Sequence, residues 1–304
     1  MKSVIKVDDF QKNYGQLRAV KGISFEVAPG EIFGLLGPNG AGKTSILECL
    51  EGLRIPNGGS IEVLGLNPVG QAEQLYNQLG VQLQSAGLPD SMQVDEAMKF
   101  FCAYHRVAPR YDLLDRLGLT AKRKDQYFQL SLGQQRRLLL ALAVAHNPAV
   151  LLLDEPTAGL DVAARVELHQ MVREMQAVGT TIILATHDMA EAEELADRVA
   201  ILLEGEIVAT GTPLELTATG AGLTKVSVRT ETACLSDTGR TWPGVKQHIS
   251  KGEYNIFYSS DIAPTLSAVI GYIDAQQDSL IDLRVERPSL EDRFLEITNT
   301  GGSK

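Results

Sequence analysis

The sequence predicts an α/β fold built on a largely parallel sheet, followed by a smaller α+β domain. Residues 1–215 alternate short apolar, β-rich runs with helical stretches, which is the pattern of a parallel sheet covered by helices. The runs at 4–7, 23–27 and 60–65 have turn-like spacing instead of crossover helices, so we expect an antiparallel sheet beside the core sheet. A glycine-rich segment between an apolar strand and a helix is the third observation.

Composition and charge exclude several classes of protein. With 304 residues, of which 44% are hydrophobic and 22% charged, the chain is globular and neither disordered nor fibrous. Its net charge of −10 has the wrong sign for coating nucleic acid or an anionic membrane. The longest apolar run, 138–145, is shorter than the roughly 20 residues of a membrane-spanning helix, and the first residues contain no signal-peptide core. We therefore expect a cytoplasmic protein in which Cys49, Cys102 and Cys234 serve for packing.

Three regions of the chain differ in pattern. Strand signals disappear between Gln84 and Asn147, which predicts a helical subdomain at about 85–147 within the α/β domain. Asp161 is placed to cap the following helix. A small-residue stretch predicts a helix-poor linker at 216–222, before an α+β domain at 223–304. In that domain we expect strands at 225–230, 245–249, 254–259 and 280–286, and helices at 263–276 and from Ser289, where Asp292 completes a capping box.

The segment GPNGAGKT matches the phosphate-loop pattern G-x-x-x-x-G-K-[ST] and has a strand before it and a helix after it. Its glycines let backbone N–H groups surround a phosphate, Lys43 supplies a positive charge, and Thr44 offers a hydroxyl to Mg²⁺. A glycine turn before a helix is the alternative. The residues that we expect to bind a nucleotide are Gly37, Pro38, Asn39, Gly40, Ala41, Gly42, Lys43, Thr44 and Ser45.

Two adjacent carboxylates end a second apolar strand, VLLLDEP at 150–156. Asp154 and Glu155 therefore fall at the carboxyl edge of the sheet, where ligands of open α/β sheets bind. We expect Asp154 to hold Mg²⁺ and Glu155 to accept the proton of the attacking water. A solvated turn is the alternative, and the phosphate loop favours the catalytic interpretation.

The segment LSLGQQRR at 130–137 opens a helix whose N-terminus carries Ser131 and Gly133. Such a helix end is suited to an anion, because its backbone N–H groups and its dipole both favour negative charge. An ordinary N-cap explains Ser131 equally well when the segment is considered alone.

The order of these motifs resembles the ATP-binding cassettes of ABC transporters, over residues 1 to about 215. The elements are GPNGAGKT, Gln84, LSLGQ, VLLLDEP, the segment AGLD that ends at Asp161, and His187 in ATHD. The resemblance implies a P-loop NTPase cassette with a mixed core sheet, an antiparallel β subdomain and an inserted helical subdomain. It also implies ATP hydrolysis with ATP and Mg²⁺ as cofactors.

The resemblance assigns further roles residue by residue. Tyr14 is similar to the aromatic residue that stacks on adenine. Gln84, in preference to Gln82, is similar to the glutamine that touches Mg²⁺ and the attacking water, since it lies four residues after Gly80. His187 is similar to the histidine that contacts the γ-phosphate. The implied metal ligands are Thr44, Gln84 and Asp154, and the implied catalytic residues are Glu155, His187 and Gln84.

In that family the signature segment closes over the nucleotide of the other subunit. The residues here are Ser131, Leu132, Gly133 and Gln134, and Asp161 is similar to the aspartate that links the two sites. The resemblance therefore implies a dimer of two such chains, or of this chain with a related cassette, around two ATP molecules. Leu132 departs from the glycine of the family pattern LSGGQ, which puts the turnover rate in question.

The resemblance also implies a separately encoded membrane permease, with the chain bound to the inner face of the cell membrane through it. The segment PSLEDRFLEIT at 288–298 is similar to the end of the ATP-binding subunits of bacterial ABC-2-type exporters. Two alternatives are a soluble ABC-type ATPase acting on nucleic acid or ribosomes, which the net charge disfavours, and a small-molecule kinase, which leaves LSLGQ and His187 unexplained. The sequence does not identify the cargo or the role of residues 223–304.

Overall fold

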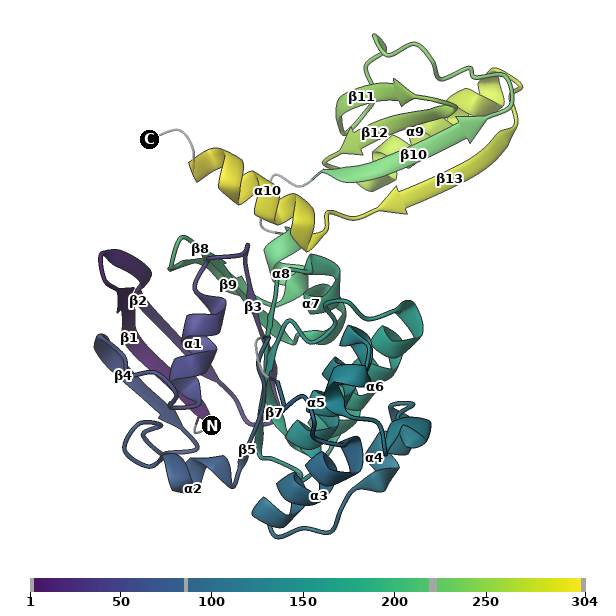
Figure 1. Ribbon diagram of the computed structural model, residues 1–304. Helices are drawn as coiled ribbons and strands as arrows, with labels where there is room; N and C mark the ends of the chain where they lie inside the picture. The colour runs from purple at the N-terminus through teal and green to yellow at the C-terminus, as the bar shows by residue number, and fades with distance from the viewer. Residues whose placement is uncertain (1–2, 85–86, 219–222, 302–304) are drawn as a thin grey trace. The chain divides into compact units, whose positions relative to one another are not determined.

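The computed structural model describes residues 3–84, 87–218 and 223–301, and the chain divides into two compact units at Pro213 and Leu214 (Figure 1). The N-terminal unit contains two sheets, as the strand spacing predicts. No described helix is long and apolar enough to cross a bilayer.

The antiparallel sheet of the N-terminal unit has the order β2-β1-β4. Its strands alternate buried and exposed side chains, so one face packs inward and the other meets solvent. Its strands are β1 (Ile5–Tyr14), β2 (Leu17–Val27) and β4 (Gly58–Val63).

The core sheet has the order β5-β6-β7-β3-β8-β9, with all neighbours parallel except the edge strand β9. Every residue of β3, β6 and β7 is buried, which explains their continuous apolar runs, since helices or a second sheet cover both faces. The strands are β3 (Ile32–Leu36), β5 (Leu79–Gln82), β6 (Val150–Asp154), β7 (Thr181–Thr186), β8 (Arg198–Leu203) and β9 (Glu206–Gly211).

The helix α1 (Lys43–Leu50) lies between the antiparallel sheet and the core sheet (Figure 1). One core cluster of buried side chains joins the two sheets, and within it the rings of Phe25 and Phe33 stack with centroids 5.2 Å apart. The phosphate-loop helix α1 is therefore packed on both sides. A short helix, α2 (Ala72–Tyr76), precedes β5.

The described part of 85–147 is helical and irregular and contains no named strand, as predicted. Its elements are α3 (Val94–Tyr104), α4 (Tyr111–Arg116), the short 3-10 turns η1 (Thr120–Lys122) and η2 (Tyr127–Gln129), and α5 (Leu132–Val144).

Two further helices complete the N-terminal unit. α6 (Val162–Ala177) begins at the predicted cap, where Asp161 Oδ1 accepts a hydrogen bond of 2.8 Å from Ala164 N. α7 (Met189–Leu195) packs on β3 and β7. Asp188 caps α7 in the same way, through Ala190 N and Glu191 N.

The C-terminal unit has an antiparallel sheet of order β11-β12-β10-β13 packed on α9. Phe257 and Val269 are fully buried between them, beside Trp242. Ser289 and Asp292 form the predicted capping box. The elements are α8 (Pro213–Ala218), β10 (Thr224–Thr230), β11 (Val245–Lys251), β12 (Tyr254–Ser259), α9 (Ile262–Ala275), β13 (Leu280–Glu286) and α10 (Leu290–Gly301).

The expected helix-poor linker at 216–222 is wrong in its first three residues. Residues 216–218 complete α8, whose first residue is Pro213, a residue suited to the first turn of a helix. Leu216 is buried, so packing stabilises a helix that its small, β-branched neighbours do not favour. The rest of the expected linker, 219–222, lies outside the described residues.

Candidate active site

Four neighbouring parallel strands of the core sheet end beside one another. β5, β6, β7 and β3 are adjacent in the sheet. The chain leaves them at Gln84, at Asp154 and Glu155, at His187, and at the loop that starts with Gly37. Because the carboxyl ends of parallel strands share one edge, segments far apart in the sequence converge there.

The loop between β3 and α1 requires glycine at two positions. Gly42 has a φ of +107°, and a Cβ there would lie 2.7 Å from the Ala19 carbonyl oxygen. A Cβ on Gly37 would lie 2.3 Å from the Leu202 carbonyl oxygen. α1 begins at Lys43, so the positive end of its dipole lies at this loop. A loop of this kind before a helix N-terminus is suited to binding a phosphate.

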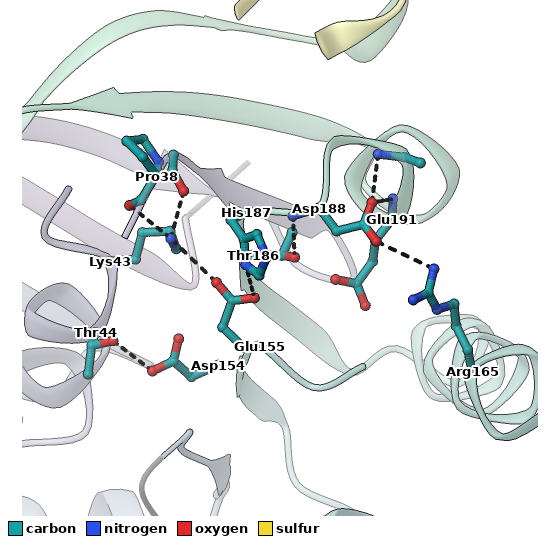
Figure 2. Close-up of polar contacts among 12 residues, drawn as sticks. Pro38, Lys43, Thr44, Asp154, Glu155, Arg165, Thr186, His187, Asp188 and Glu191 are labelled. Atoms are coloured by element: carbon teal, nitrogen blue, oxygen red, sulfur yellow. Dashed lines mark hydrogen bonds and ion pairs between the residues drawn. The ribbon is translucent and has the colours of Figure 1, made fainter. Parts of the chain in front are cut away.

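The ammonium of Lys43 is buried, with 5% of the residue exposed. Lys43 Nζ donates to the carbonyl oxygen of Gly37 at 2.7 Å and to that of Pro38 at 3.2 Å (Figure 2). It also lies 3.4 Å from Glu155 Oε1. The loop carbonyl oxygens and the Glu155 carboxylate thus hold the ammonium of Lys43 at the N-terminus of α1.

Thr44 and Asp154 connect the loop to β6. Thr44 Oγ1 donates to Asp154 Oδ2 at 2.8 Å (Figure 2). Asp154 is fully buried, and its Oδ1 has no hydrogen-bond partner among the described residues. Burial raises the pKa of Asp154, and the hydrogen bond from Thr44 opposes that effect. An unpartnered carboxylate oxygen beside a hydroxyl supplies the oxygen donors that Mg²⁺ prefers, so these residues fit that ion.

Glu155 is held in a strained conformation that aims its carboxylate at the other site residues. Its φ is +50°, a left-handed value that non-glycine residues adopt at an energetic cost. Its backbone N–H donates to the Ala185 carbonyl oxygen on β7 at 2.8 Å. Glu155 Oε2 lies 2.6 Å from Nδ1 of His187, so Glu155 joins the ammonium of Lys43 to the imidazole (Figure 2).

A cavity of about 360 Å³ opens over the phosphate loop. Gln84 lines it, whereas Gln82 is fully buried in β5 and its amide has no hydrogen-bond partner within the described part of the chain. The cavity therefore favours Gln84 over Gln82 for a site role. The lining residues are Tyr14, Leu17, Ala19, Pro38, Asn39, Gly40, Gly42, Lys43, Thr44, Ser45, Gln84, Asp154 and Glu155.

Tyr14 lies at one wall of this cavity and is 38% exposed. Its hydroxyl lies 3.2 Å from Ser45 Oγ. The sequence reasoning missed Leu17 and Ala19, which line the same wall from β2. The pairing of Tyr14 with Leu17 at the β1–β2 turn indicates a role for Leu17 and Ala19, because it places the start of β2 beside any ligand of Tyr14.

The predicted signature segment lies elsewhere. Ser131 is the N-cap of α5, where its hydroxyl accepts from Gln134 N at 3.3 Å and Gln134 Oε1 accepts from Ser131 N at 2.9 Å. The N-cap interpretation is therefore confirmed. Leu132 is 60% exposed and extends toward Gly159. In the described parts of the chain, residues 131–134 and Asp161 do not line the cavity at the phosphate loop.

Fold and site together define a nucleotide-binding protein of the P-loop class. Residues 20–158 match the family described as "ABC transporter". The chain is 34% identical over 312 residues to the "Daunorubicin resistance ATP-binding protein DrrA3" of Streptomyces coeruleorubidus, an alignment that covers 97% of this chain and 96% of the relative. It therefore belongs to the ABC transporter family and is an ABC-type ATPase.

Other known proteins agree with this membership. The "Nod factor export ATP-binding protein I" of Paraburkholderia xenovorans (strain LB400) is 36% identical over 305 residues, with 97% of each chain covered. A solved "Structure of ATP binding subunit of ABC transporter" has a TM-score of 0.67 and 25% identity, covering 71% of this chain and 92% of the other. A dimeric post-hydrolysis cassette bound to ADP and Pi shares the fold, with a TM-score of 0.63 and 24% identity over 68% of this chain and 98% of the other.

Proposed function

We propose that this ATPase powers a separately encoded membrane permease in export, as one of two cassettes in a dimer. The observation that carries the proposal is the meeting of Lys43, Asp154, Glu155 and His187 at one edge of the core sheet. Export is supported by relatives named for drug resistance and Nod factor export, whose alignments include the C-terminal unit. In this proposal residues 1–215 form the ATPase domain and 223–304 an accessory domain.

Each site residue has a role that its position supports. Lys43 and the phosphate loop bind the phosphates of ATP, and Tyr14 stacks on the adenine from the cavity wall. Thr44, Asp154 and Gln84 are the residues that would hold Mg²⁺, which neutralises phosphate charge when bound. Glu155 accepts the proton of the attacking water, and His187, in contact with Glu155, reaches the γ-phosphate.

The signature segment serves the nucleotide of the second cassette. Ser131 and Leu132 are exposed and line no part of their own chain's phosphate cavity. Asp161 caps α6 and lies two residues after Gly159, which is next to the side chain of Leu132. In this proposal Asp161 links the two sites. Two chains therefore pair about a two-fold axis, and ATP hydrolysis separates them.

The shared site predicts a complementation experiment. Ser131→Arg chains and Lys43→Ala chains each form defective homodimers, but a mixed dimer retains one intact composite site. We expect the mixture to recover part of the ATPase rate, with each variant alone as the control. Glu155→Gln should form dimers with ATP that hydrolysis no longer separates, detected by size-exclusion chromatography. No recovery of the ATPase rate in the mixture, together with no ATP-dependent dimer of Glu155→Gln, would refute the shared site.

An apolar groove on the N-terminal unit supports a membrane partner. The groove has a volume of about 530 Å³, and Phe100, Tyr104 and Leu53 line it with about 60% of each residue exposed. Glu51 also lines it, is 8% exposed, and has a carboxylate oxygen without a hydrogen-bond partner among the described residues. A short apolar segment of the permease that carries one basic side chain satisfies both features.

Docking at this groove is tested by purifying the chain from its native membrane and measuring how much permease copurifies with it. Phe100→Glu should abolish copurification, because it places a charge on the apolar wall. Val178→Glu is the matched control, since Val178 is 84% exposed at the end of α6 and does not line the groove. Equal copurification of both variants would refute docking at this groove. Recovery of this chain in the membrane fraction, and its loss from that fraction in Phe100→Glu, also tests the proposed attachment to the membrane through the permease.

A further inference from the structure

One face of α6 carries four polar side chains that contact α7 and the residues beside it. Arg165, His169, Arg173 and Gln176 are separated by four, four and three residues, so they form a stripe along the helix, which we call the α6 stripe. α7 has seven residues and starts directly after the segment that contains His187. A helix this short is not stable alone, so tertiary contacts decide its position.

Both ends of α7 are attached to the α6 stripe. Arg165 Nη1 lies 3.4 Å from Oδ2 of Asp188, the residue that caps α7 and follows His187 directly (Figure 2). Asp188 also connects to β7, since its N–H donates to Thr186 Oγ1 at 3.0 Å. At the other end, Arg173 donates to the Glu194 carbonyl oxygen and Gln176 Nε2 donates to Asp197 Oδ2.

His169 is the buried centre of the α6 stripe, with 6% of the residue exposed. Its Nδ1 lies 3.1 Å from Glu194 Oε2, and its Nε2 lies 3.6 Å from Glu191 Oε1. Glu191 is 2% exposed, and neither of its carboxylate oxygens has a hydrogen-bond partner within the described ranges. A buried carboxylate needs a nearby positive charge, and His169 supplies one when its imidazole is protonated.

The two carboxylates that face His169 from α7 favour its charged form. Glu191 first, and Glu194 second, raise the pKa of His169 above its ordinary value, against the opposing effect of burial. A histidine with a raised pKa in the folded state stabilises its contacts below that pKa. The stabilisation is lost as the pH rises through it.

We infer that His169 is a positioning residue for ATP hydrolysis, which as a charged imidazolium holds α7, and with it the His187 segment, against α6. The inference rests on the proposed role of His187. Asp161, the residue proposed to link the two sites, caps α6. The α6 stripe therefore also connects Asp161 to His187 of the same chain. His169 itself lies in α6, away from the cavity lining, and acts through Glu191 and Asp188.

The first test measures the titration of His169 by NMR. The chain has five histidines, so its imidazole signals are few, and the spectrum of His169→Gln identifies the signal that belongs to His169. We expect this signal to titrate above the ordinary range of histidine, and Glu194→Gln to lower its pKa. Glu194 is exposed, so this variant is expected to fold. A His169 that titrates at or below the ordinary value overturns the inference.

The second test measures kcat and KM for ATP against pH. His169→Gln should lower kcat about tenfold at neutral pH, since a displacement of about 1 Å at a catalytic group can cost up to about 100-fold. KM should change less than twofold, because the phosphate loop is not touched. In the wild type kcat should fall on the alkaline side with the pKa of His169, and Glu194→Gln should move that fall to lower pH. His169→Gln should lose it.

Gln170→Ala is the matched control, because Gln170 neighbours His169 and contacts only Glu174 of the same helix among the polar contacts found in the described residues. It should keep the wild-type profile. An unchanged kcat and pH profile in His169→Gln overturns the inference. His187→Ala separates the two proposals: if it leaves kcat intact, the role of His187 fails, while the NMR titration still decides whether His169 is the charged centre of the α6 stripe.

Discussion

Replacement of Lys43 by alanine is expected to weaken ATP binding strongly without unfolding the chain. Lys43 Nζ is buried and already oriented by the carbonyl oxygens of Gly37 and Pro38, so it needs little reorganisation to meet a phosphate. A hydrogen bond to a charged group contributes about 1.5–3 kcal/mol, which corresponds to a Kd roughly 10- to 150-fold higher. The substitution removes the ion pair between Lys43 and Glu155, and the Glu155 carboxylate keeps its contact with His187.

The assay is isothermal titration calorimetry with a slowly hydrolysed ATP analogue. Lys6→Ala is the control, because Lys6 is an exposed lysine whose ammonium pairs with Glu26 at 3.8 Å, outside the site. The Tm of both variants, measured in parallel, shows that the fold is intact. A Kd for Lys43→Ala within twofold of the wild-type value, in a folded protein, would refute the assignment of the phosphate site.

Three other substitutions test separate parts of the molecule. Burial and the neighbouring Glu48 raise the pKa of Glu51 from 4.5 to about 7, so stability falls as the pH rises across that interval; Glu51→Gln should raise Tm at pH 8 but hardly at pH 5, and equal shifts would contradict this. Leu132→Gly should increase the ATPase rate at saturating ATP, because it removes a side chain that restrains the close approach of a second subunit. An unchanged rate would contradict such a restraint. Phe257→Ala should cost about 3–5 kcal/mol in the C-terminal unit alone. Calorimetry should then show one lowered transition, and a shift of the whole chain would argue against two separate units.

Local patterns predicted many elements correctly because they depend on neighbouring residues. The cap at Asp161, the capping box of Ser289 with Asp292 and the strands of the C-terminal unit each follow from a few adjacent side chains. The error at 216–218 has the opposite cause. There the burial of Leu216 stabilises a helix that the adjacent small and β-branched residues do not favour.

The sequence by itself determined the class of fold, the phosphate-loop motif and the order of the family motifs, since these are short-range patterns written in adjacent residues. The tertiary structure alone decided that Gln84 and not Gln82 lines the cavity, that Glu155 adopts a left-handed φ, and that His169 is buried against Glu191. Each of these depends on strands and helices distant in the sequence, whose neighbours, burial and charge environment exist only once the sheet and its helices have packed.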